Sequence, residues 1–208
     1  MRPLAECARV YPHGMAEELD VEVTEEEGAP PPPLDPEVAA RREAALRHVI
    51  QFGDPVLKAK ALPVERFDDD LRNEVAAMGM LMDDALGVGL AATQLGRLRR
   101  LLVYRVVAGG PLGALINPVL EWSSKENELY EEGCLSLPRV HVDVERPIHV
   151  RVSARDEWGE PITIEASGLE ARVIQHEMDH LDGVLILDRA SREQRKEAMR
   201  ALREALPA

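Results

Sequence analysis

Two histidines placed four residues apart in a predicted helix constrain this chain more than any other feature. They occur in the segment 176–180, His-Glu-Met-Asp-His. Because residues i and i+4 of an α-helix lie one turn apart on the same face, the imidazoles of His176 and His180 can reach one metal ion. The chain is therefore expected to fold so that this helix face borders a metal site.

The helix itself is predicted from the residues at its two ends. Ser167 and Glu170 have the spacing of a capping box, and Gly183 stands where a glycine commonly follows the last helical turn. These residues predict a helix from Gly168 to Leu181. Both histidines lie within it, so their spacing translates into a shared face.

Glu177 follows His176 and can lean over an open position on the metal, where a general base acts. Two histidines do not complete a catalytic site, because a third protein ligand is needed. The sequence after His180 lacks the third histidine of metzincins. A downstream glutamate, Glu193 or Glu197, would give the ligand set of a thermolysin-like zinc peptidase.

Cys134 is the other candidate for the third ligand. It lies in the segment 132–136, Glu-Gly-Cys-Leu-Ser. A thiolate binds both zinc and ferrous iron strongly. A lone cysteine is more often a small buried apolar residue, but beside a two-histidine helix that lacks a third ligand the metal role is favoured.

A glycine-rich segment, 87–96, follows another predicted helix. Its first residues fit the G-x-G-x-x-G/A dinucleotide pattern, but that pattern must follow a strand and open a helix. Here the order is reversed, so we reject a dinucleotide site. We expect a loop whose glycines let the backbone approach a substrate, with Gln94 as a neutral amide donor. Considered alone, Gln94 would be a solvated loop residue.

The remaining patterns predict helices and strands in mixed order. Apolar residues recur at spacings of three and four from Asp69 to Leu86, which indicates an amphipathic helix. A last helix is predicted from Ser191 to Leu206. This order lacks regular βαβ alternation and so indicates an α+β fold. Apolar and β-branched runs predict strands near 101–107, 115–120, 140–152 and 161–165.

The first 34 residues are predicted to form a disordered acidic extension. They hold a run of glutamates and then four prolines at 30–33, with little to bury. Residues 35–48 predict a connecting helix, with Asp35 as its N-cap and a proline at its first position. We expect residues 49–208 to form the catalytic domain.

Charge and cysteine content narrow the range of partners and compartments. The formal net charge of −13 argues against DNA as a partner, because phosphate would be repelled. Residues 1–43 hold 11 acidic and 4 basic side chains, so more than half of that net charge lies there. Two cysteines, Cys7 and Cys134, make no disulfide framework. With no apolar run long enough to cross a membrane and no signal segment, we expect a cytoplasmic protein.

Three segments, in this order, resemble the peptide deformylase family. The family pattern is a G-x-G-L-A-A-x-Q loop, then E-G-C-L-S, then Q-H-E-x-D-H-L. In this chain these are Gly87 to Gln94, Glu132 to Ser136, and Gln175 to Leu181. Asn117-Pro118 also looks like a family feature. The resemblance covers most of the chain and leaves the acidic extension outside it.

The resemblance implies a fold and a metal site. The fold would have antiparallel or mixed sheets around a central metal-binding helix, with a further helix at the C-terminus. Cys134, His176 and His180 would bind one divalent ion. The family usually uses Fe²⁺, and Zn²⁺ or Ni²⁺ can occupy the site.

The resemblance also implies a reaction, the removal of the formyl group from the N-terminal formyl-methionine of new proteins, which releases formate. Glu177 would be the catalytic acid and base. The Gln94 side chain and the Leu135 backbone N–H would form the oxyanion hole. Gly89 would contact the substrate through its backbone, and Val88 would line the methionine pocket.

Two contacts with partners stay open. Family members often have an arginine after the cysteine segment that holds the peptide, and Arg139 and Arg146 are both candidates. The last predicted helix carries a net charge of +2, which suits a contact with ribosomal RNA. Its mixed charges also fit a solvated helix with i,i+4 pairs, and we favour that interpretation.

Two other functions compete with deformylation. One is a zinc endopeptidase of the HExxH type with Glu193 or Glu197 as a ligand. The other is a catalytically silent protein that only binds nascent N-termini. Glu177 and Gln94 argue against the silent protein, since binding alone needs no general base.

Overall fold

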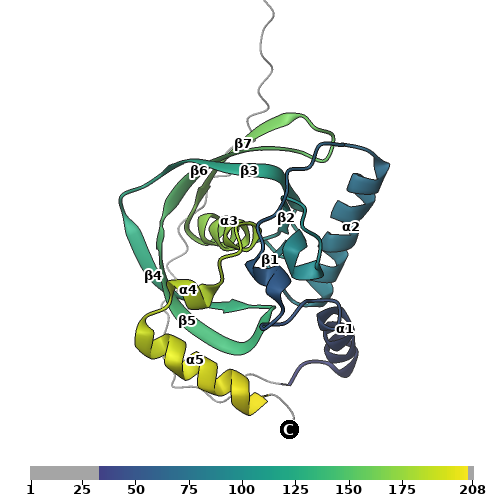
Figure 1. The fold of residues 1–208 in the computed structure, drawn as a ribbon. Coiled ribbons are helices and arrows are strands. Elements are labelled where there is room, and N and C mark those ends of the chain that lie inside the picture. The colour runs from purple at the N-terminus through teal and green to yellow at the C-terminus, as the bar shows by residue number, and fades with distance from the viewer. Residues whose placement is uncertain (1–32, 206–208) are drawn as a thin grey trace, which may run out of the picture.

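One helix, α3 (Gly168–Leu181), lies in the middle of the molecule, with two antiparallel sheets arranged around it (Figure 1). The computed structural model describes residues 33–205. Nearly all of the predicted extension, including Cys7, lies outside the described residues, as does Leu206, the predicted end of the last helix. The arrangement confirms the predicted α+β fold around a central helix.

The larger sheet has five strands in the order β1-β2-β3-β6-β7, and the smaller sheet consists of β4 and β5. Each neighbouring pair is antiparallel. The strands are β1 (Gly89–Ala91), β2 (Leu101–Tyr104), β3 (Gly113–Ser123), β4 (Asn127–Cys134), β5 (Leu137–Pro147), β6 (His149–Arg155) and β7 (Pro161–Ser167).

Further helices surround the sheets in the described part of the chain. They are α1 (Pro36–Leu46), α2 (Asp69–Asp84), α4 (Ile186–Arg189), α5 (Arg192–Ala205) and two 3₁₀ helices, η1 (Pro55–Lys58) and η2 (Ala92–Leu95).

The predicted helices are present, with differences at some of their ends. The connecting helix predicted over 35–48 is α1, which ends at Leu46. The helix predicted to reach Leu86 is α2, which ends at Asp84 because Leu86 adopts a positive φ of 58°. Helix α3 has the predicted bounds, and Gly183 has the expected positive φ of 73°. The predicted capping box is wrong. The Ser167 side chain makes no cap hydrogen bond, because its Oγ pairs with His149 Nδ1 at 2.8 Å.

Two strands carry too little pattern to be predicted. Strand β4 has a single buried residue, Glu132, so it shows none of the apolar alternation that identifies a half-buried strand. Strand β1 is three residues long and was expected to be part of a loop. Both strands border the candidate site described below.

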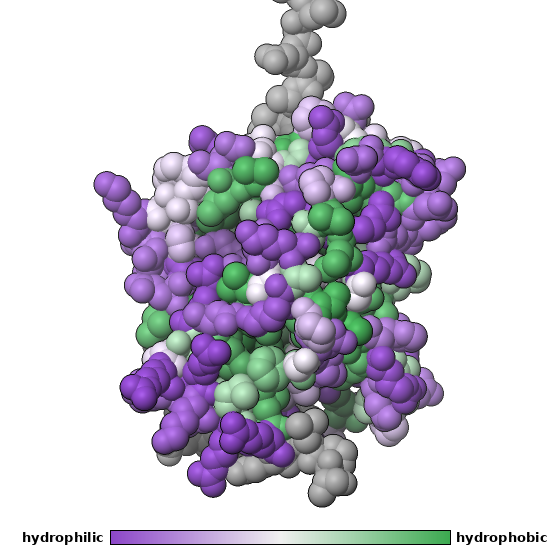
Figure 2. Space-filling view, viewed as in Figure 1, coloured by the Kyte–Doolittle hydropathy of each residue, from purple (hydrophilic) through white to green (hydrophobic). Residues whose placement is uncertain are grey.

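Apolar side chains pack α3 against the inner face of the five-stranded sheet. Ile174 and Leu181 of α3 and Val152 of β6 are fully buried in this cluster. Each such side chain contributes about 1.5–3 kcal/mol to folding. On the face shown in Figure 2, hydrophobic residues lie mainly toward the centre and hydrophilic ones form most of the rim. Among residues 33–205, none of the helices is both long and apolar enough to span a bilayer.

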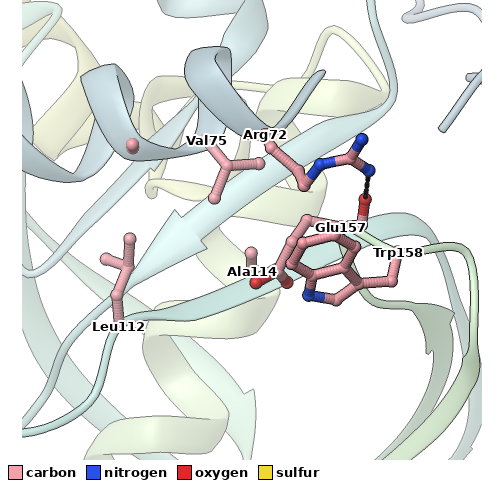
Figure 3. Close-up of a pocket in the computed structure, with 7 residues that line it drawn as sticks. Arg72, Val75, Leu112, Ala114, Glu157 and Trp158 are labelled. Carbon is pink, nitrogen blue, oxygen red and sulfur yellow. Dashed lines mark hydrogen bonds between the residues drawn. The ribbon is translucent and has the colours of Figure 1, made fainter. Parts of the chain in front are cut away.

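Helix α2 is attached to the turn between β6 and β7 by an aromatic contact. The Arg72 guanidinium lies 4.4 Å from the ring centre of Trp158 and donates to the Glu157 carbonyl (Figure 3). A hollow of about 230 Å³ lies beside this contact, lined also by Val75 and Leu112. It shares no residue with the metal cluster described below.

Asn117 links strand β3 to the segment before α2 through its side chain. Its φ is +55°, a left-handed conformation that asparagine tolerates better than most residues. Its Oδ1 accepts from the Val64 N–H and its Nδ2 donates to the Val64 carbonyl, both at 2.8 Å. The amide thereby fixes the segment before α2 against β3.

We predict that Asn117→Ala lowers the free energy of unfolding by about 2–4 kcal/mol. The substitution leaves both backbone groups of buried Val64 without partners and puts alanine in a strained conformation. Urea unfolding provides the measurement. Asn117→Gly, which relieves only the strain, should recover part of the loss. If both variants match the native stability, the side chain has no such role.

Candidate metal centre and active site

Three potential metal ligands converge where the smaller sheet meets the central helix. Cys134 is the last residue of β4, and His176 and His180 lie one turn apart on α3. One ligand atom from each residue lies within 4.8 Å of the other two. Cys134 Sγ is 3.2 Å from His180 Nε2. The thiol from a distant segment and the two imidazoles therefore meet at one point.

A bulge in the smaller sheet brings the cysteine to this point. Gly133 pairs with His141, but the next residue, Cys134, pairs with Leu137. The intervening residues of β5 are displaced, and Arg139 among them has a positive φ of 62°. Bulges often occur beside active sites because they change the direction of a side chain.

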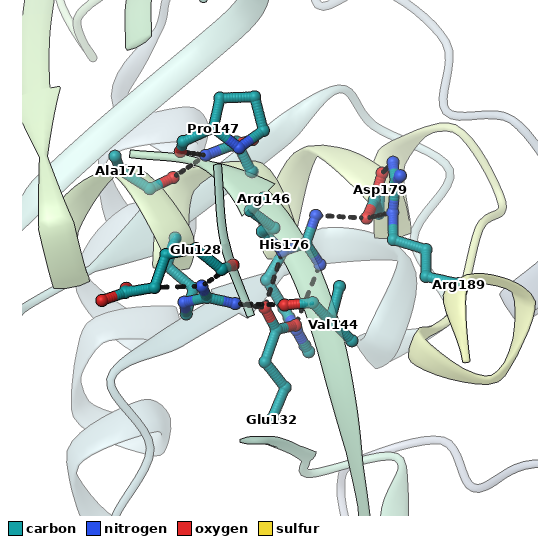
Figure 4. A network of polar contacts seen from close by, with 11 residues as sticks. Glu128, Glu132, Val144, Arg146, Pro147, Ala171, His176, Asp179 and Arg189 are labelled. Carbon is teal, nitrogen blue, oxygen red and sulfur yellow. Dashed lines mark hydrogen bonds and ion pairs between the residues drawn. The ribbon is translucent and has the colours of Figure 1, made fainter. Parts of the chain in front are cut away.

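A buried carboxylate fixes the orientation of one imidazole. Glu132 Oε2 lies 3.0 Å from His176 Nδ1, and Glu132 is also bound by Arg146 and Arg172 (Figure 4). Burial would raise the pKa of Glu132, but hydrogen bonds from His176 and Arg146 lower it to about 2. With Nδ1 engaged in this way, the other ring nitrogen of His176 is left for a metal.

The donor set fits a divalent transition metal. One sulfur and two imidazole nitrogens are ligands of zinc and ferrous iron, and three protein ligands leave a position open, as catalytic sites require. Burial lowers the pKa of His180 well below its usual value, so its ring is neutral and able to bind a metal. The carboxylate that supports His176 is the kind of partner that metal-binding histidines generally have.

Glu177 is buried beside this cluster and faces strand β1. Its Oε2 has no hydrogen-bond partner among the described residues. Burial raises the pKa of Glu177 to about 7. A Cβ atom added at Gly89 would lie only 2.8 Å from Glu177 Cγ, so a glycine is required for this approach. Val88, the residue before β1, is partly exposed.

Gln94 is held rigidly and is not a solvated loop residue. It is 1% exposed. Its Oε1 accepts from the Ala91 N–H at 2.9 Å, and its Nε2 donates to Ser136 Oγ at 3.2 Å. The same nitrogen lies 3.6 Å from Cys134 Sγ. The side-chain N–H groups of Gln94 therefore face the cluster. Leu135 lies next to the cluster because it directly follows Cys134 in the sequence.

The two arginines left open by the sequence have different surroundings. Arg146 is buried, and its guanidinium is engaged by Glu132 and Asp179. Arg139 is exposed on the bulge of β5. Of the two, only Arg139 has a side chain free to meet a peptide from solution.

Helix α5 keeps the alternative glutamate ligands away from the cluster. Glu193 and Glu197 are exposed on α5, which packs against β5 through residues such as Ala198. Neither glutamate belongs to the group of potential ligands found in residues 33–205. The ligand set required for a thermolysin-like endopeptidase is therefore not formed.

A protein-family model described as "Polypeptide deformylase" matches residues 46–196. This match covers most of the chain and includes all three segments that form the site. The chain belongs to the polypeptide deformylase family. The family match leaves out residues 1–45, which include nearly all of α1, and residues 197–208, which include most of α5.

Individual relatives agree with this family membership. The chain is 48% identical to a peptide deformylase of Acidothermus cellulolyticus, over 77% of this chain and 88% of that one. It is 47% identical to peptide deformylase 1 of Corynebacterium efficiens, over 76% and 95% of the two chains.

Solved deformylase structures have the same fold. A peptide deformylase from Synechococcus elongatus, in complex with actinonin, has a TM-score of 0.71 and 44% identity, covering 74% of this chain and 85% of that one. A peptide deformylase from Legionella pneumophila has a TM-score of 0.72 and 38% identity, covering 75% and 92%.

Sequence reasoning missed the residues that support the ligands. In the sequence, Glu132 and Ser136 are part of a motif that gives them no individual role, and Arg146 is a candidate only for peptide binding. The sequence feature that could have identified Glu132 is its charge two positions before the cysteine. Only the fold shows that this side chain is buried.

We predict that Glu132→Gln lowers the free energy of unfolding by about 3–5 kcal/mol, because buried Arg146 and Arg172 lose the carboxylate that they share. Urea unfolding of the metal-free protein measures this. Glu128→Gln is the matched control on the same strand. Its carboxylate is about half exposed and 3.6 Å from Arg172, so we expect a loss below about 1 kcal/mol. Equal losses in the two variants would contradict the prediction.

Proposed function

We propose that Cys134, His176 and His180 bind the divalent metal ion with which this deformylase removes the formyl group from N-terminal formyl-methionine. The reaction acts on newly made proteins and releases formate. The observation that carries the proposal is the convergence of the three ligand atoms within 4.8 Å beside buried Glu177. A bound ion of this kind acidifies water and polarises a carbonyl oxygen.

We assign proton transfer to Glu177. Its buried carboxylate has an oxygen without a partner among residues 33–205, so it can accept a proton from the attacking water. Its pKa of about 7 suits a group that accepts a proton and then returns it near neutral pH. The proton then passes to the departing amine, which leaves as the free N-terminus of methionine.

We assign stabilisation of the formyl oxygen to Gln94 and to the Leu135 backbone N–H. The Gln94 amide is held by Ala91 and Ser136, so it donates without having to reorient as negative charge develops. Preorganised donors of this kind typically contribute about 10²–10³ in rate.

Substrate contacts are assigned around β1. Gly89 would meet the peptide through its backbone, which the missing side chain leaves accessible beside Glu177. Val88 would line the pocket for the methionine side chain. Arg139 would contact the following residues of the peptide, because Arg146 is buried and engaged.

We predict that Glu177→Gln keeps about one metal ion per chain but lowers formate release from formyl-Met-Ala-Ser by at least about 100-fold, since a general base is lost. Metal analysis and the activity assay use the same sample. Glu193→Gln, on the exposed face of α5, is the matched control and should keep full activity. Substantial turnover by the Glu177 variant would remove this residue from its role.

We propose Fe²⁺ as the native ion, with Zn²⁺ or Ni²⁺ able to replace it. The thiolate among the ligands favours ferrous iron or zinc over hard ions such as magnesium, and the choice of iron follows the ion that the family usually uses. Metal analysis of protein purified without oxygen tests it. A sample that contains zinc and lacks iron under those conditions would contradict it.

We propose the cytoplasm, where nascent chains emerge, as the site of action. Helix α5 is the element to test for contact with the ribosome, against the solvated helix that its mixed charges favour. The apolar side of α5 packs against β5, which leaves Arg192, Lys196 and Arg203 exposed. Cationic side chains of this kind suit ribosomal RNA.

We predict that a triple variant with glutamate at these three positions loses cosedimentation with ribosomes and keeps its activity on formyl-Met-Ala-Ser. The substitutions reverse the charge of the exposed face but leave the catalytic cluster unchanged. The native chain at low and high salt provides the reference. Equal cosedimentation of both proteins would leave α5 as a solvated helix.

A further inference from the structure

Arg189 lies at the outer end of a continuous chain of charged side chains that reaches the metal cluster. Its guanidinium binds both carboxylate oxygens of Asp179 on α3. One of those oxygens, Oδ2, also accepts from Arg146 Nη1 at 2.8 Å. Arg146 donates on its other side to Glu132, which is bound to His176 (Figure 4). Positive and negative groups alternate along the whole path.

Burial increases along this path from Arg189 to Arg146. The Arg189 side chain is 42% exposed, that of Asp179 is 12% exposed, and that of Arg146 is 2% exposed. Arg146 is too deeply buried for solvent to replace a lost partner. Its orientation is therefore fixed by the two carboxylates at its edges, and each must keep its own position.

Asp179 needs Arg189 to stay in position. It directly precedes His180 on α3 and lies near the surface, where an aspartate side chain can rotate toward water. The two-oxygen pairing with a planar guanidinium restricts that rotation, because both N–H groups must remain aligned. Arg189 belongs to α4, so the element that leads into α5 is tied directly to the metal-binding helix.

We propose that Arg189 is a positioning residue for the metal centre, acting through Asp179, Arg146 and Glu132 to hold the imidazole of His176. The inference rests on the proposed metal ligands. Without Arg189, Asp179 turns toward solvent, Arg146 loses one carboxylate and shifts against Glu132, and the support of His176 weakens. Residues that support a metal ligand commonly change metal affinity by about 10–100-fold.

The test measures cobalt binding as well as activity. In Arg189→Ala the dissociation constant for Co²⁺, from competition with a chelator, should rise by about 10-fold. The visible absorption of the Co²⁺ protein should shift, and kcat should fall while KM changes little. Arg189→Lys keeps the charge but not the planar pairing, so its dissociation constant for Co²⁺ should lie between those of the native chain and Arg189→Ala. Arg42→Ala, an exposed arginine on α1, should behave as the native chain.

A double variant separates this path from a general loss of stability. If Arg189 acts through Asp179, adding Arg189→Ala to Asp179→Asn should not weaken Co²⁺ binding further. Native affinity and spectrum in Arg189→Ala, even with a lower melting temperature, would overturn the inference while leaving the metal centre in place. The proposed centre itself fails, and this inference with it, if the native chain binds no Co²⁺ or if Cys134→Ser leaves the thiolate-to-cobalt absorption unchanged.

Discussion

The buried carboxylate of Glu132 is the interaction on which the rest of the site depends. It lies on β4 yet binds His176 and Arg172 of α3 and Arg146 of β5. A charge in this position is stable only if it is paired and fully hydrogen-bonded. The hydrogen bonds of Glu132 hold the two-stranded sheet against the central helix. Cys134 follows Glu132 by two residues on β4, so the same contact places it beside the histidines.

Two carboxylates only a few residues away from the proposed ligands have opposite environments, and this difference supports the different roles proposed for them. Glu132 is surrounded by cations, so its pKa is lowered to about 2 and it stays ionised as a support. Glu177 is buried with one oxygen unpaired in the described part of the chain, and its pKa is raised to about 7. Separating two like groups in this way is how a protein obtains both a fixed charge and a proton carrier.

Local sequence patterns predicted those helices and strands that bury one face and expose the other. Helix α3 was predicted correctly because its histidines, apolar residues and Gly183 all follow helical geometry. Strand β4 was not predicted, because only one of its eight residues, Glu132, is buried. The capping box failed for a related reason. Ser167 has a competing partner, His149, which belongs to another strand and is invisible in a local window.

The sequence by itself determined which chemical groups are available: two imidazoles on one helix face, a glutamate beside them, a cysteine and a glycine-rich segment, because these depend on residue type and short spacing. Only the tertiary structure decided which groups meet. Gln94 lies beside the cysteine and not in solvent because of a contact between residues 40 positions apart. Arg146 supports a histidine and does not bind a peptide because it contacts Glu132 on β4 and Asp179 on α3. Such contacts arise from the packing of whole elements, which a local pattern of residues does not specify.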